Sequence, residues 1–209
     1  MIRAVICDFG GVLTTPLVRS FLAFQEHSGI SMGDLGQAMA SMAEENGAHP
    51  LFELECGRLS ERDFIAGIER GLGGGRRLDG FSAKYFEHLD RNEPMIECMR
   101  SLRDRGFRMA MLTNNVREWE PLWRAKLPEI DEIFELVVDS AFVGMRKPEP
   151  EIYELTVSRI GDGVAASECV FIDDTDVNCQ AAESLGMVAV HFVDSDQAIP
   201  EIEKAVSEQ

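Results

Sequence analysis

Long apolar runs, an excess of positive charge and regularly spaced cysteines are all missing from this sequence. None of its apolar stretches reaches the ~18 residues of a membrane-spanning helix, and the chain starts without the basic leader of a signal peptide. Acidic residues outnumber basic ones 37 to 20, which gives a formal net charge of −17. Because such a charge disfavours nucleic acids and anionic membranes, we expect neither as a partner.

The five cysteines are odd in number, and no two of them lie at CxxC spacing. This pattern disfavours both a disulfide framework and a zinc site. It predicts a protein of the reducing cytoplasm. The negative net charge still permits a small anionic ligand, because helix N-termini and one local cation can bind a single phosphate group.

Five short apolar runs, rich in β-branched side chains, predict β-strands. Continuous apolarity, rather than alternation, is what a parallel sheet buried on both faces requires. Between the runs lie helical patterns. The predicted strands are 4–7, 108–112, 135–138, 169–172 and 188–192, and the helices are 94–105, 150–160 and 177–185. This alternation predicts an α/β fold of the doubly wound, Rossmann-like kind, with a parallel sheet.

Residues 16–93 interrupt the alternation, because they contain helical patterns and no convincing strand. The patterns lie at 16–27, 32–44, 60–72 and 82–88. We therefore expect an α/β core of residues 1–15 and 94–209, with an all-helical cap inserted after the first strand at 16–93. Such a cap would exclude water and set substrate choice. Its segment 51–55 could line the substrate entrance or simply pack within the cap.

Polar residues that could bind a ligand or take part in catalysis follow three of the predicted strands. Asp8 follows the first, Thr113 the second and the pair Asp173-Asp174 the fourth, while Lys147 lies in a loop after the third. Ligands of open parallel sheets bind beyond the carboxyl ends of the strands. Clustered carboxylates suit Mg²⁺, a further carboxylate can attack phosphorus, and a lysine with a hydroxyl can orient phosphoryl oxygens. These residue types together fit magnesium-dependent phosphoryl transfer.

The order of these residues resembles the four motifs of the haloacid dehalogenase-like (HAD) superfamily, over essentially the whole chain. The most specific parts are the run GMRKPE around Lys147 and the run FIDD that ends at Asp174. They are similar to the branch that holds α-D-glucose-1-phosphate phosphatase and the phosphatase-like N-terminal domain of soluble epoxide hydrolase. The resemblance implies a HAD fold with a helical cap, and hydrolysis of a small phosphorylated metabolite, such as a sugar phosphate.

The resemblance also implies which residues handle the phosphoryl group. Asp8 would be the nucleophile and become an aspartyl-phosphate. Thr113 and the amide of Asn114 would hold the phosphoryl oxygens. Lys147 would bridge Asp8 and the phosphate.

A magnesium ion is the cofactor that the resemblance implies. Asp8, the carbonyl of Gly10 and Asp174 would bind it directly, and Asp173 would bind it directly or through water. Asn178 would support the loop that carries the two aspartates.

Gly10 departs from the pattern of most phosphatases of the superfamily, which have an acid/base Asp two residues after the nucleophile. Such a group contributes about 10²- to 10⁴-fold to the rate. Three hypotheses remain open: a phosphatase that tolerates the gap, a weak or inactive protein that binds a phosphorylated ligand or a partner, and a metal-independent dehalogenase. The retained residues favour the phosphatase. The sequence is compatible with a monomer or a homodimer.

Overall fold

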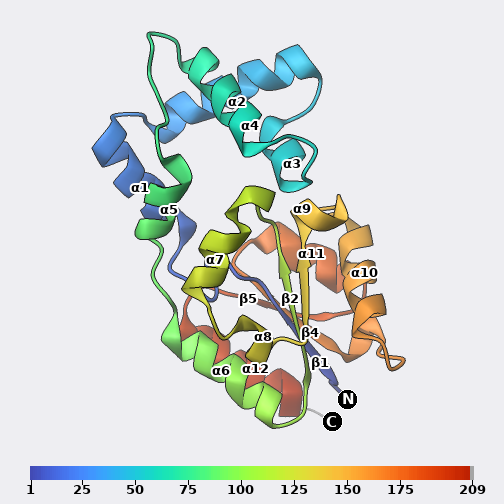
Figure 1. Ribbon diagram of the computed structural model, residues 1–209. Coiled ribbons are helices and arrows are strands. Elements are labelled where there is room, and N and C mark those ends of the chain that lie inside the picture. Colours follow the sequence, from blue (N-terminus) through green and yellow to red (C-terminus); the bar gives the residue numbers. More distant parts are fainter. Residues whose placement is uncertain (208–209) are drawn as a thin grey trace.

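A five-stranded parallel sheet forms the centre of the computed structural model, which describes residues 1–207, with the backbone alone for Leu17, Phe21 and His27 (Figure 1). Residues 208 and 209 of the expected core lie outside the described residues. The strand order is β3-β2-β1-β4-β5. The strands are β1 Ala4–Cys7, β2 Arg108–Thr113, β3 Leu136–Asp139, β4 Cys169–Asp173 and β5 Val188–His191.

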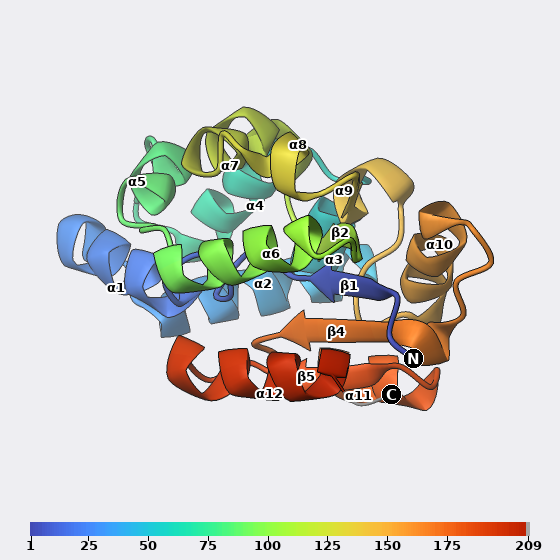
Figure 2. The ribbon, with the colours of Figure 1, turned by 90° about the horizontal axis from the view of Figure 1, so that it is seen from below.

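Helices cover both faces of the sheet, which explains why its strands are apolar nearly throughout (Figure 2). Side chains alternate along β1: Val5 and Cys7 face one layer, whereas Ala4 and Ile6 face the other. The first layer contains α6 Glu93–Asp104 and α12 Ser195–Ser207, and the second contains α10 Pro150–Ile160 and α11 Asp176–Ser184. The prediction of a doubly wound α/β fold is therefore confirmed.

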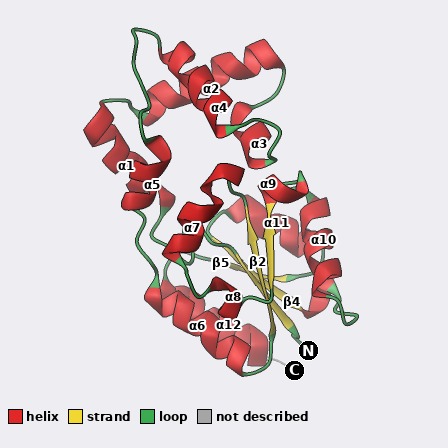
Figure 3. Ribbon diagram, viewed as in Figure 1, coloured by secondary structure: helices red, strands yellow, loops and turns green. Residues whose placement is uncertain are grey.

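Five helices separate β1 from α6, and we call this segment, residues 17–87, the insert (Figure 3). Its described residues contain no strand. Phe24, Ile30, Met42 and Ile68 belong to a third apolar cluster, which also includes Val116 from the segment after β2. The helices are α1 Leu17–Ser28, α2 Met32–Asn46, α3 Pro50–Glu55, α4 Glu61–Leu72 and α5 Phe81–Glu87. Of these, the short α3 was not predicted.

The two segments that connect the insert to the sheet lie side by side. Thr14 and Arg91 form an isolated antiparallel bridge. The Thr15 N–H donates to the Asp90 carbonyl at 2.8 Å, and the Asn92 N–H donates to the Leu13 carbonyl at 2.9 Å. The insert therefore leaves and rejoins the rest of the chain at one place.

Short helices fill the remaining connections between the strands. They are η1 Arg117–Trp119, α7 Glu120–Lys126, α8 Ile130–Ile133, α9 Ser140–Val143 and η2 Ala166–Glu168. The sequence analysis did not predict these elements; all of them except α7 have only three or four residues, too few to show a helical period. None of the helices in the described part of the chain is both long and apolar enough to cross a membrane.

Candidate active site

Asp8 lies at the carboxyl edge of the sheet, where the central strand ends. Its N–H still donates to the Ile172 carbonyl of β4 at 2.9 Å, and the register pairs Cys7 with Ile172. The residue that follows each of these two is an aspartate, so Asp8 lies next to Asp173. The parallel register thus brings two carboxylates together from positions 165 residues apart.

Lys147 lies between these two carboxylates. Its Nζ is 2.9 Å from Asp8 Oδ1 and 2.6 Å from Asp173 Oδ2, and its side chain is 1% exposed. The side chain of Asn114 holds the lysine backbone: Asn114 Nδ2 donates to the Lys147 carbonyl at 3.0 Å, and the Lys147 N–H donates to Asn114 Oδ1 at 2.8 Å. The Asn114 side chain is thus engaged with the lysine loop.

Asp173 accepts hydrogen bonds on both carboxylate oxygens. Oδ2 accepts from the ammonium group of Lys147, and Oδ1 accepts from the Thr175 N–H at 2.8 Å and from Asn178 Nδ2 at 3.0 Å. Asn178 lies near the start of α11 and is buried. These contacts fix the orientation of Asp173, so a metal ion would meet a carboxylate that other groups already share.

Asp174 lies against the loop that follows Asp8. Gly11 has a φ of +82°, and a Cβ added there would lie 2.1 Å from Asp174 Oδ2. Only glycine therefore lets the loop approach this carboxylate so closely. Ligand oxygens of Asp8, Asp173 and Asp174 all lie within 4.8 Å of one another. A trio of carboxylates with neighbouring carbonyls fits a hard divalent cation such as Mg²⁺.

Gly11→Ala should lower the free energy of unfolding by about 2–4 kcal/mol. An alanine at this position has the unfavourable positive φ, and its Cβ also conflicts sterically with Asp174. Gly186→Ala is the matched control: its φ is +88°, but no atom lies within 4 Å of its added Cβ. Urea unfolding of the two variants separates conformational strain from the conflict. Equal losses of stability would show that Asp174 moves away at no cost.

Three carboxylates, those of Asp8, Asp173 and Asp174, lie close to one ammonium group, that of Lys147. Burial raises the pKa of Asp8 to about 7, although Lys147 opposes the shift. Burial alone would lower the pKa of Lys147, but Asp173 and Asp8 outweigh it, and that pKa lies above its usual value. Burial, followed by the charge of Asp173, raises the pKa of Asp174. A divalent cation would supply the positive charge that stabilises the ionised forms.

A hollow of about 610 Å³ opens above this group, and it is lined by Asp8, Thr113, Lys147 and Asp174 among others. Thr113 ends β2 and is 2% exposed. Asp8, Thr113, Asn114, Lys147 and Asp174 thus meet in one hollow, with Asp173 beneath them. A carboxylate beside an ammonium group, a hydroxyl and a possible cation can attack an electrophile that carries negative oxygens.

Glu55 and Arg146 also line this hollow, although the sequence analysis singled out neither residue. Arg146 Nε donates to Glu55 Oε2 at 2.7 Å, with both side chains about 15% exposed. The pair therefore joins α3 of the insert to the loop that carries Lys147. Glu55 lies in segment 51–55, which the sequence analysis considered for the substrate entrance. Arg146 precedes the motif residue Lys147, and nothing in the sequence distinguished it from its neighbours.

Most of the chain matches a known protein family: the haloacid dehalogenase-like hydrolase model matches residues 2–186. Bifunctional epoxide hydrolase 2 of Sus scrofa is 26% identical over 230 aligned residues. The match covers 100% of this chain but only 39% of that protein, so the chain spans less than half of its length.

Two further similar proteins match nearly end to end. Sesquiterpene phosphatase astK of Aspergillus oryzae is 29% identical over 98% of this chain and 96% of its own length. A HAD family enzyme of Bacteroides thetaiotaomicron, solved with magnesium and inorganic phosphate, has a TM-score of 0.67 at 22% identity. That match covers 91% of this chain and 93% of the other, and it shows that the two share a fold.

Proposed function

Because the chain belongs to the haloacid dehalogenase-like hydrolases, we propose that it is a Mg²⁺-dependent phosphatase of small phosphomonoesters that acts through an aspartyl-phosphate on Asp8. The observation that carries the proposal is the buried Lys147, which lies 2.9 Å from Asp8 and 2.6 Å from Asp173 beside a third carboxylate. The phosphatase from Aspergillus oryzae and the magnesium- and phosphate-bound enzyme from Bacteroides thetaiotaomicron add support.

The proposed reaction has two displacements at phosphorus. A carboxylate oxygen of Asp8 attacks the phosphorus atom, and the bond from phosphorus to the alcohol oxygen breaks. Water then attacks the phosphorus of the aspartyl-phosphate, which releases inorganic phosphate and restores Asp8. Lys147 favours the ionised form of the Asp8 carboxylate and faces the phosphoryl oxygens, while the hydroxyl of Thr113 and the N–H of Asn114 donate to them.

The metal would be held by Asp8, the Gly10 carbonyl and Asp174, with Asp173 behind them. When bound, Mg²⁺ would offset negative charge on the phosphoryl group and the carboxylates. Asp173 fits a contact through water best, because Lys147, Thr175 and Asn178 already bond to its oxygens. Residues 1–15 and 94–209 would form the catalytic domain and residues 16–93 its cap.

Gly10 keeps a second candidate function open, that of a weak enzyme or a binding protein for phosphorylated ligands. The side chain that would protonate the leaving oxygen is missing at this position. Substrates whose leaving group needs little acid assistance should therefore react fastest. Leaving-group pKa should affect the rate more strongly than in phosphatases that have the second aspartate.

Activity with p-nitrophenyl phosphate tests the proposed function, because p-nitrophenolate leaves without a proton. We expect turnover with Mg²⁺ and at least a tenfold fall in EDTA, restored by excess Mg²⁺. Calorimetric titration of the same protein with Mg²⁺ gives a readout that is independent of turnover. Mg²⁺ binding without turnover would favour the binding protein, and chloride release from 2-chloropropionate in EDTA would favour a dehalogenase.

A further inference from the structure

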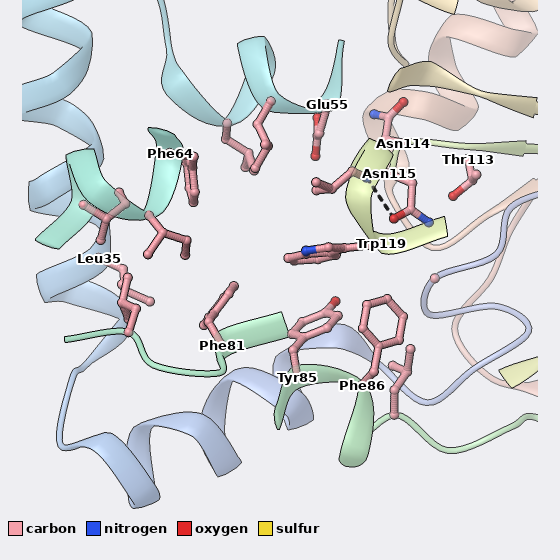
Figure 4. A pocket seen from close by; sticks show the side chains of 18 of the residues that line it. Leu35, Glu55, Phe64, Phe81, Tyr85, Phe86, Thr113, Asn114, Asn115 and Trp119 are labelled. Atoms are coloured by element: carbon pink, nitrogen blue, oxygen red, sulfur yellow. Dashed lines mark hydrogen bonds between the residues drawn. The ribbon is translucent and has the colours of Figure 1, made fainter. Parts of the chain in front are cut away.

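We propose that the phosphate ester hydrolysed at Asp8 carries an apolar alcohol, and that a cavity between the insert and the sheet edge binds it. This inference rests on the function proposed above and names the substrate class of the same site. The cavity has a volume of about 230 Å³ (Figure 4). Its position, lining and size each support the inference.

The cavity joins the hollow above Asp8. Four residues line both spaces: Gly10, Glu55, Thr113 and Asn114. Figure 4 shows Thr113 and Asn114 at one end of the cavity, with Leu35 and Phe64 at the other. A phosphoryl group held at Asp8 would therefore direct its alcohol past Thr113 into the cavity.

Away from this junction the lining is apolar except for Asn115 and the hydroxyl group of Tyr85. Leu35 and Met39 come from α2, Phe64 and Ile68 from α4, and Phe81 from α5. Glu55 is the one charged side chain among the described residues of the lining, and it lies at the junction. The hydroxyls of a sugar would lose their hydrogen bonds to water against such walls, at a substantial cost in free energy.

Trp119 adds a flat aromatic wall to the cavity. Its indole N–H donates to Glu61 Oε1 at 2.8 Å, so the polar edge of the ring is already paired. Its ring centroid lies 6.0 Å from that of Phe81 and 5.2 Å from that of Tyr85. The aromatic group offers hydrophobic contact and specific ring geometry to an apolar ligand.

The size of the cavity limits the alcohol. An apolar cavity of about 150 Å³ holds one benzene molecule, so by proportion 230 Å³ accommodates roughly nine carbon atoms. The expected substrate is the phosphomonoester of a medium-chain, branched or cyclic hydrocarbon alcohol. This class differs from the sugar phosphates that the sequence analysis considered.

A series of n-alkyl phosphates tests the substrate class directly. From ethyl to octyl phosphate, kcat/KM of the wild-type enzyme with Mg²⁺ should rise by up to roughly fourfold per methylene and by more than tenfold in all. Octyl phosphate should also exceed glucose 6-phosphate, whose leaving group is likewise a primary alcohol, more than tenfold. A flat series, or preference for the sugar, would overturn the inference. Phosphate release from none of the esters, p-nitrophenyl phosphate included, would instead overturn the proposed function.

Met39→Trp places a large ring in the cavity and locates the binding site. The ratio of kcat/KM for octyl phosphate to that for ethyl phosphate should fall at least tenfold. Gln37→Trp, on the exposed face of the same helix, is the matched control and should keep the wild-type ratio. An unchanged ratio in Met39→Trp would show that the alkyl group of the substrate binds outside this cavity.

A binding measurement decides the question if Met39→Trp fails to fold. Octylphosphonate has a P–C bond that the proposed reaction does not break, so its binding to the wild-type protein can be followed at equilibrium. Because Trp119 lines the cavity, octylphosphonate with Mg²⁺ should shift the tryptophan emission of the protein, whereas methylphosphonate should not. Equal spectra with the two ligands at saturation would contradict the inference.

Discussion

Asp8→Asn should lower kcat for p-nitrophenyl phosphate at least about 10³-fold, because an amide oxygen cannot form the aspartyl-phosphate. The two side chains have nearly the same shape, and the substitution removes a buried carboxylate whose pKa burial raises to about 7. We therefore expect the variant to fold. Steady-state release of p-nitrophenol at saturating Mg²⁺ measures the effect, and circular dichroism checks the fold.

Asp139→Asn is the matched control for this experiment. Asp139 ends β3 at the same edge of the sheet, is 5% exposed, and also has a pKa that burial raises, to about 6. It lines neither the hollow above Asp8 nor the apolar cavity. The control should keep activity within a few-fold of wild type. Turnover in Asp8→Asn within tenfold of the control would exclude Asp8 as the nucleophile.

Lys147→Met should cause the second large effect, on both stability and activity. The substitution leaves the buried Asp8 and Asp173 without their shared cation, which should lower the free energy of unfolding by about 3–5 kcal/mol in EDTA. Loss of the ammonium group beside the phosphoryl oxygens should lower kcat about 10²- to 10³-fold. Urea unfolding and steady-state kinetics measure the two effects separately.

The double variant Lys147→Met/Asp173→Asn separates the two contributions. Removing one of the uncompensated carboxylates should restore part of the stability that Lys147→Met loses, but none of the activity. If the double variant loses as much free energy of unfolding as Lys147→Met and Asp173→Asn lose together, Lys147 and Asp173 are not coupled. Activity that recovers with stability would mean that Lys147 acts only by supporting the fold.

Parallel strands explain why so much of the candidate site could be predicted from the sequence. A short apolar run followed by Asp8, Thr113 or Asp173 marks a carboxyl strand end, and in a parallel sheet such ends share one edge. The α/β fold, the HAD resemblance and the hydrolase class are confirmed on this basis. The roles of the individual residues, the cytoplasmic location and the oligomeric state stay predictions.

The parts that could not be predicted depend on how distant segments pack. The helix α3 has only six residues, too few to show an amphipathic pattern, yet its Glu55 reaches the junction of both spaces. Trp119 belongs to no motif that the sequence shows, yet it forms one wall of the cavity. The spacing of Phe64 and Ile68 is that of any helix with one buried apolar face. That they also border an empty volume depends on the tertiary placement of α2, α4 and α5, which a single sequence does not encode locally.

The paired connections at Thr14 and Arg91 have an evolutionary consequence. Because the insert leaves and rejoins the chain at one place and supplies most of a third apolar cluster, selection could reshape the walls of the apolar cavity without disturbing the register that aligns Asp8 with Asp173. Side-chain contacts still tie the insert to the rest of the chain, among them the ion pair between Glu55 and Arg146 and the hydrogen bond from Trp119 to Glu61. Descendants of this protein should therefore diversify faster on the cavity-lining faces of α2 and α4 than at these contacts.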